Sequence, residues 1–313
     1  MTPERHAGRG YALAATGAAM FSLNGIFARY LLEDGVGPAR LSQLRSAGSC
    51  LLLLVVLGIT RPRLLRVERS ELPGLAVLGV AGLAAVHASF FLAVDRLKIG
   101  TALTIQYTAP LFILIWLRIV HGRRLARSLW GAVGLSVIGC FFVVRAYAPG
   151  DLDAIGVLAA LASMVTFAIY LVGSERSGRR HQAVTTLFWA FGFATLFWAI
   201  VTPWWSFPWE PLSTTRNALL ALGLIVVGTL VPFILTVAAL RHIPSPRVAV
   251  VATLEPVLAA VLAWVILDEV LTAVQIAGGV TVLTAVAWVQ SRRPDLETES
   301  APEMRRETRF SPR

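Results

Sequence analysis

Ten runs of about 20 mostly apolar residues follow one another along this chain of 313 residues, separated by short polar or arginine-rich joints. A helix needs roughly 20 apolar residues to cross the hydrocarbon core of a bilayer. Charged residues make up only 15% of the chain, against about 25% in soluble domains. The pattern therefore predicts an all-α integral membrane protein with ten transmembrane helices at residues 11–31, 41–59, 72–94, 101–120, 129–147, 154–173, 184–203, 217–240, 247–267 and 271–290.

Little sequence remains outside these helices. Residues 1–10 are predicted to form a leader, and residues 291–313, rich in Glu, Arg and Pro, a disordered tail. If the ten helices alternate in direction, 21 of the 28 lysines and arginines fall on the side that carries both ends. The positive-inside rule then places both termini in the cytoplasm. Because the basic residues are spread over loops, the net charge of +10 does not indicate a nucleic-acid partner.

An internal repeat relates the two halves of the chain. An offset of 146 residues superposes the chain on itself without a gap from Gly10 to the last predicted helix, pairing Gly82 with Gly228. Residues 11–147 and 154–290 would then each contain five helices. Because five is odd, the second half enters the membrane from the opposite side, which makes the halves inverted repeats. Two such halves can open a central site alternately to each side of the membrane.

Pro110 and Pro256 are superposed by the same offset, near the midpoints of the fourth and ninth predicted helices. A proline removes one backbone hydrogen bond, and the freed carbonyl is tolerated at membrane depth only where protein or water satisfies it. We therefore predict that both prolines break their helices beside a central cavity. The alternative is a kink that serves packing alone.

Glu255 lies in the stretch "ATLEPVLAAVLAWVILDEVLT", well inside the ninth predicted helix. A carboxylate there costs about 2.5 to 3.5 kcal/mol on insertion scales, so it is expected to face the bundle interior and to have a partner or a proton. Its counterpart in the repeat is Ala109, so only one half carries the acid. We predict that Glu255 binds substrate or couples transport to protons. The alternative is a structural glutamate held by Arg45 or His87.

His87 and Arg45 are two further ionisable residues inside predicted spans. An imidazole takes up or releases a proton near neutral pH, so His87 is a second candidate for proton coupling and for substrate binding. A hydrogen-bonded interior histidine is the alternative. Arg45 is a candidate for substrate binding, and its alternative is a side chain that snorkels to the nearby membrane surface.

Neutral polar side chains complete the predicted binding site. Such donors, acceptors and rings suit a small polar or aromatic solute better than an ion. The alternative is that they form hydrogen bonds between helices. The candidates lie in the first, fourth and sixth predicted helices: Asn24, Thr104, Gln106, Tyr107, Thr166 and Tyr170, with Asn24 and Tyr170 superposed by the repeat.

The sequence contains no GxxxxGK[ST], HExxH, CxxC or GxSxG motif, so it predicts no cofactor, no metal site and no enzyme activity of these types. A membrane-embedded enzyme would need clustered acids or a nucleophile, and a scaffold would be expected to carry a soluble domain. Glycines in the fifth and tenth predicted helices are expected to form close-packed faces that seal the bundle or a homodimer interface: Gly131, Gly134, Gly139, Gly278 and Gly279.

These features resemble the EamA-type ten-helix branch of the drug/metabolite transporter superfamily, over about residues 10–290. Glu255-Pro256 and Glu269 are similar to the family's motif in the second repeat, and "YTAPLFILIWLRIVHGRRL" is similar to its counterpart in the first. The sequence differs where Gly122-Arg123 replaces the Gly-Glu that usually ends the fourth helix.

The resemblance implies a secondary carrier in the inner (plasma) membrane of a bacterium. It also implies alternating access and, commonly, efflux of amino acids, related metabolites or toxic compounds. The sequence thus predicts a small-molecule transporter embedded in the lipid bilayer. An uncoupled facilitator of the same fold remains open, and so, less favoured, does a membrane-embedded enzyme or scaffold.

Overall fold

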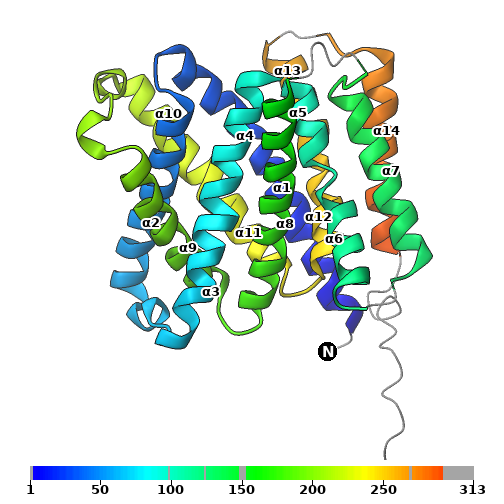
Figure 1. The fold of residues 1–313 in the computed structure, drawn as a ribbon, viewed down its shortest axis with the longest axis horizontal. Coiled ribbons are helices and arrows are strands. Elements are labelled where there is room, and N and C mark those ends of the chain that lie inside the picture. The colour runs from blue at the N-terminus through cyan, green and yellow to red at the C-terminus, as the bar shows by residue number, and fades with distance from the viewer. Residues whose placement is uncertain (1–2, 98, 123–124, 148–152, 268–269, 292–313) are drawn as a thin grey trace, which may run out of the picture.

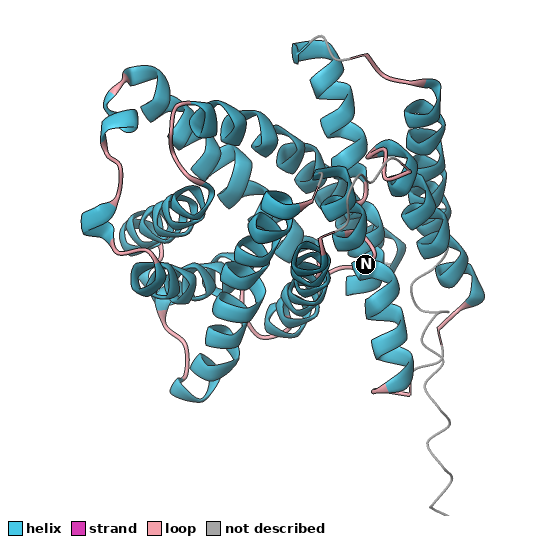
Figure 2. Ribbon diagram, turned by 45° about the horizontal axis from the view of Figure 1, so that its top comes forward, coloured by secondary structure: helices cyan, strands magenta, loops and turns pink. Residues whose placement is uncertain are grey.

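The computed structural model describes residues 3–97, 99–122, 125–147, 153–267 and 270–291, and within these ranges the regular structure is entirely helical (Figures 1 and 2). The predicted tail, apart from Ser291, and the acid Glu269 lie outside the described residues. The α-helices are α1 Pro3–Glu33, α2 Pro38–Thr60, α3 Leu72–Val77, α4 Ala85–Arg96, α5 Ile99–Gln106, α6 Ala109–Ile119, α7 Arg127–Val143, α8 Ala154–Gly178, α9 Ala183–Val201, α10 Thr215–Ile225, α11 Val231–Ala239, α12 Ser245–Ala252, α13 Leu254–Leu267 and α14 Ala273–Ser291.

Nine helical spans in the described part of the chain are long and apolar enough to cross a membrane, and α7 is a shorter apolar helix of 17 residues. Their order agrees with the ten predicted spans, so the all-α membrane fold is confirmed. Helix α1 already begins at Pro3, within the predicted leader. In Figure 1, α1 begins and α14 ends at the same face of the bundle, which we term the N-terminal face, as distinct from the opposite face.

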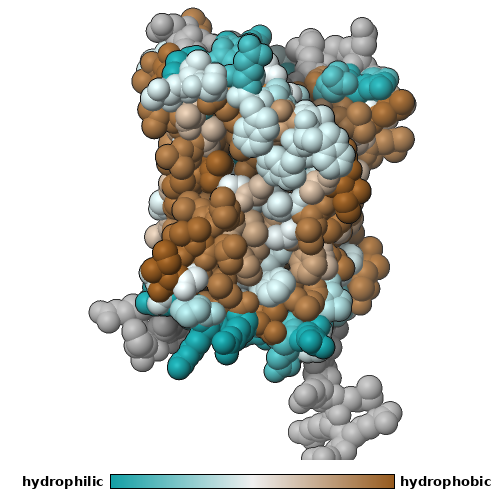
Figure 3. Space-filling view, turned by 90° about the vertical axis from the view of Figure 1, so that its left-hand side faces the viewer, coloured by the Kyte–Doolittle hydropathy of each residue, from teal (hydrophilic) through white to brown (hydrophobic). Residues whose placement is uncertain are grey.

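The surface has the layers expected of a protein in a bilayer. Figure 3 shows a hydrophobic band between two hydrophilic ends. The loop after α9 carries exposed aromatic rings, since Trp205 is 88% and Trp209 58% exposed. Arg40 ties this loop to α2 by donating to the Pro203 carbonyl oxygen at 3.0 Å. Such rings are enriched where a membrane meets water.

Helix α7 ends four residues before the predicted boundary. The backbone N–H of Ala146 donates to the Phe141 carbonyl at 3.0 Å, and that of Arg145 donates to the Phe142 carbonyl at 3.2 Å. Arg145 has a positive φ of 56°. This pattern is a Schellman motif, which normally has glycine at the left-handed position. Because arginine occupies this position, the residue types did not predict that the helix ends here.

Two long spans are interrupted by π-helical segments, η3 at Leu78–Ala84 and η6 at Val226–Leu230. The offset of 146 residues superposes the last residues of the two segments. π-Helical turns inside α-helices occur frequently at functional sites. Their matched positions support the predicted repeat, and neither was visible in the hydropathy pattern.

Helices α7 and α14 pack side by side at one edge of the bundle (Figure 1) through the predicted glycine face. A Cβ atom added at Gly139 would lie 2.8 Å from the backbone nitrogen of Val282 and 2.9 Å from the carbonyl oxygen of Gly278. The backbones approach this closely only because neither glycine has a side chain. Gly139 and Gly278, two of the glycines predicted to form a close-packed face, therefore pack against each other within one chain.

The contact at Gly139 is expected to be essential for stability. We expect Gly139→Val to destabilise the folded protein by at least about 2 kcal/mol, because the new side chain meets backbone atoms that cannot give way. Gly134→Val on the same helix is the matched control, since nothing lies within 4 Å of a Cβ atom there. Thermal unfolding in detergent measures both. Equal melting temperatures for the two variants would contradict this account of the packing.

Candidate functional site

A cavity of about 710 Å³ lies in the centre of the bundle. Its walls come from both halves of the chain: α1, α2, α4 and α5 from the first half, and α8, α10, α11, α12 and α13 from the second. Seven of the nine predicted substrate-binding residues line it: Asn24, Arg45, His87, Gln106, Tyr107, Tyr170 and Glu255. The structure therefore brings together residues that are distant in sequence.

Thr104 and Thr166 are not among the residues that line the cavity. The hydroxyl of Thr166 donates to the carbonyl oxygens of Ala162 and Ser163, one turn earlier in its own helix. Threonine commonly makes such bonds in helices. A polar residue inside a predicted span marks a position on its helix, and residue type alone does not show whether that face of the helix borders a cavity.

Two helix breaks place the polar residues at membrane depth. One helix is interrupted at Tyr107–Thr108, between α5 and α6 and shortly before Pro110. Another is interrupted at Thr253, between α12 and α13 and shortly before Pro256. Each proline lacks the N–H that would bind the carbonyl four residues earlier. Those carbonyls belong to Gln106 and Ala252, and both residues line the cavity. This arrangement agrees with the rule that irregular backbone inside a membrane borders a cavity or packed protein.

The break before α13 determines the environment of Glu255. It makes Glu255 the second residue of α13, in its first turn. A carboxylate is favoured there because the helix dipole is positive at its N-terminus. The Tyr107 hydroxyl is a hydrogen-bonding partner of the carboxylate, and Arg45 acts on it electrostatically. The helix N-terminus and Tyr107 thus stabilise Glu255, and its side chain also lines the cavity.

Arg45 reaches the cavity from α2. Its side chain is only 5% exposed, so it does not snorkel to the membrane surface. Its Nε donates to Thr229 Oγ1 at 2.8 Å, and Thr229 Oγ1 donates to the Leu224 carbonyl at 2.7 Å, so the π-helical segment η6 orients the guanidinium. Among the described residues, the terminal amino groups of Arg45 make no hydrogen bond and no ion pair with Glu255. Two opposite charges therefore line one cavity without neutralising each other directly.

An aromatic wall forms another side of the cavity. The Phe233 ring lies 4.9 Å from Phe21, 5.2 Å from Tyr170 and 6.4 Å from His87, all in edge-on geometry. Phe91 stacks beside His87 at 6.5 Å. Phenylalanines are as apolar as lipid-facing residues, so hydropathy alone did not identify them. A helical-face analysis would have found Phe91, four residues after His87, and Phe21, three residues before Asn24. Phe233 shares no helix with a predicted site residue.

Three buried polar atoms near this wall have no hydrogen-bond partner among the described residues: Asn24 Oδ1, His87 Nδ1 and Tyr170 OH. Leaving a buried polar group unsatisfied costs about 1 to 3 kcal/mol. Close packing against glycines in the π-helical segments holds two of these residues, because Gly228 abuts Asn24 and Gly82 abuts Tyr170. The offset of 146 residues pairs Gly82 with Gly228 and Asn24 with Tyr170. The unsatisfied atoms are therefore candidates for binding a polar solute or water.

Among the described residues that line the cavity, the exposed ones lie toward one face of the bundle. At the opposite face it is lined by exposed charged residues, the ion-paired Arg29 and Glu33 at 3.0 Å, and Asp95. Toward the N-terminal face its lining consists of buried residues such as Ala14 and Val248. The structure thus shows a central site accessible from one side.

Comparison with known proteins agrees with this architecture. The sequence profile of the EamA-like transporter family matches residues 8–145 and again residues 154–290. The chain is 28% identical over 241 residues to the pseudopaline exporter CntI of Pseudomonas aeruginosa, covering 77% of this chain and 82% of that relative. It is 25% identical over 229 residues to the threonine/homoserine exporter RhtA of Escherichia coli, covering 71% and 72%. A solved crystal structure that is 18% identical shares the fold, with a TM-score of 0.75 over 92% of this chain and 99% of that chain.

Proposed function

The chain belongs to the EamA-like transporter family, and from this premise we propose that it exports a small zwitterionic metabolite of the amino-acid class by alternating access. The observation that carries the proposal is the pair of opposite charges, Arg45 and Glu255, in one cavity of about 710 Å³. A guanidinium binds carboxylate in a bidentate fashion. The carboxylate of Glu255 suits an ammonium group. The aromatic wall suits an apolar side chain, and the names of the exporters RhtA and CntI support efflux as the direction.

Glu255 also provides a route for proton coupling. A carboxylate that binds either a proton or a substrate ammonium group can exchange one for the other, which couples the two fluxes. His87 is the second candidate for coupling, since it lines the same cavity. An uncoupled facilitator is the competing function, because the position of Glu255 in the first turn of α13 supports a purely structural role.

Two inverted five-helix halves, residues 11–147 and 154–290, would provide the alternation. The two family matches, the matched π-helical segments and the related Gly82 and Gly228 contacts support this division. We further propose a bacterial inner membrane location with both termini in the cytoplasm, on the basis of the arginine distribution. The opposite face, where the cavity opens, would then be the outside.

Solute counterflow in proteoliposomes tests the proposed substrate class. Vesicles preloaded with an unlabelled amino acid are expected to take up the labelled form, whereas labelled carboxylic acids and amines that carry one charge are expected to move little. The reason is that each of these leaves one of the two charges in the cavity uncompensated. Rapid movement of singly charged amines with no movement of amino acids would contradict the assignment.

A further inference from the structure

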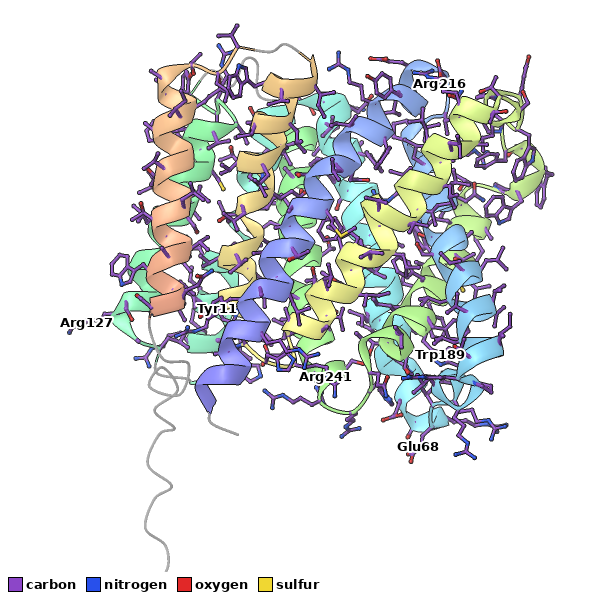
Figure 4. All side chains as sticks on the ribbon, turned by 180° about the vertical axis from the view of Figure 1, so that it is seen from behind. Tyr11, Glu68, Arg127, Trp189, Arg216 and Arg241 are labelled. Carbon is purple, nitrogen blue, oxygen red and sulfur yellow. The ribbon has the colours of Figure 1, made fainter. Side chains whose placement is uncertain are left out.

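A buried arginine lies where the cavity ends toward the N-terminal face. Arg247, the third residue of α12, is 0% exposed and is among the largest fully buried side chains in the described part of the chain. Its partner Tyr11 lies near the N-terminal face in Figure 4, at the same end as Arg127 and Arg241 and far from Arg216. Neither residue stands out in the amino-acid sequence.

Among the described residues, three hydrogen bonds join α1, α12 and α14 at this point. The Tyr11 hydroxyl donates to the Val289 carbonyl oxygen at 2.9 Å. An amino group of Arg247 donates to the same carbonyl at 2.8 Å and also to the Tyr11 hydroxyl. The guanidinium carbon lies 5.9 Å from the centre of the Tyr11 ring. Hydrogen bonds from a charged donor are roughly twice as strong as neutral ones, so this cluster is a firm tie between three helices.

The cluster lies directly beneath the cavity. Ala14, one helical turn after Tyr11, and Val248, the residue after Arg247, both line the cavity and are both buried. Gly10 packs against the chain between α11 and α12, where an added Cβ atom would come within 2.8 Å of His242. Opening the cavity toward the N-terminal face therefore requires α1 to separate from α12 and α14.

We propose that Tyr11 and Arg247, with the Val289 carbonyl, form the gate that closes the cavity at the N-terminal face. This inference rests on the proposed alternating access. Both are positioning residues, because they hold helices together and neither lines the cavity. In the transport cycle the three hydrogen bonds break when the site opens to the N-terminal face, and they form again when it opens to the opposite face.

Side-specific thiol labelling tests the gate without any substrate. Cys50 and Cys140 are replaced by alanine, and one cysteine is introduced at Ala252, which lines the cavity. A membrane-impermeant reagent is applied to vesicles of known orientation, from one side or the other. In the parent, labelling is expected mainly from the opposite face. Tyr11→Phe removes two of the three hydrogen bonds, because the Tyr11 hydroxyl donates one and accepts the other. It is expected to shift the ratio toward the N-terminal face by at least roughly tenfold, the effect of losing the bond from the charged Arg247 alone.

Tyr147→Phe is the matched control, because this tyrosine is 43% exposed and lies away from the gate. Arg247→Lys, which keeps the charge, is the second gate variant and is expected to shift the ratio in the same direction. An unchanged ratio in both folded gate variants would overturn the proposal. Equal gains in labelling from both faces would also overturn it, since they indicate general loosening. If the ratio shifts but no solute moves in counterflow, the gate stands and the proposed substrate class fails.

Discussion

Glu255→Gln is expected to abolish proton-driven accumulation of substrate, while exchange of substrate continues with a raised half-saturating concentration because the variant lacks the charge proposed to bind the ammonium group. In proteoliposomes with an acidic lumen, a one-unit pH gradient is worth about 1.4 kcal/mol per proton, which supports up to about tenfold accumulation at one proton per solute. Glutamine has nearly the same shape but carries no exchangeable charge. The accumulation ratio is therefore expected to fall to about one, whereas counterflow of labelled solute continues.

The control for this experiment is Glu210→Gln, which makes the same chemical change at an exposed position outside the cavity. It is expected to accumulate substrate like the parent. If folded Glu255→Gln protein still concentrates solute in response to the pH gradient, Glu255 is not the coupling group. Its role would then be structural, through Tyr107 and the first turn of α13. His87→Gln is the next variant to examine in that case.

Arg45→Gln is expected to weaken substrate binding by about a hundredfold. Truncating one partner of a buried charge pair costs about 2 to 5 kcal/mol, and the substrate carboxylate would lose the guanidinium that is proposed to bind it. The half-saturating concentration in counterflow measures this effect. Arg40→Gln is the matched control on the same helix, because Arg40 binds the loop after α9 and does not line the cavity.

An amine analogue that lacks the carboxylate separates recognition from general damage. In the parent, the amino acid is expected to bind far better than the amine. In Arg45→Gln the preference is expected to disappear, because the group that reads the carboxylate is gone. A preference that survives in the variant would show that another residue binds the carboxylate, even if overall transport has fallen.

Most of the architecture could be predicted because a bilayer imposes one length and one composition on every spanning helix. The ten spans follow from that constraint. Glu255, Arg45 and His87 stood out because ionisable residues are rare at membrane depth. All three line the cavity, where their predicted roles remain to be tested.

The remaining features depend on three-dimensional packing. The place of Phe233 in the cavity wall could not be predicted, because an apolar ring is as favourable facing lipid as facing a cavity. Arg247 begins the ninth predicted helix, and its position there does not reveal that it is buried at the junction of three helices. The helix end at Arg145 depends on a backbone angle that residue type does not reveal. Hydropathy also averages over the π-helical segments, so the contacts of Gly82 and Gly228 could not be foreseen from it.

The most direct test of the central claim is the flux of labelled amino acids into proteoliposomes that contain the unmodified protein, with and without a pH gradient. The account predicts that at least one amino acid accumulates when the lumen is acidic, that a protonophore removes the accumulation, and that Glu255→Gln lacks it. Equal, pH-independent flux in the parent and in Glu255→Gln would contradict coupling through this cavity and favour the uncoupled facilitator.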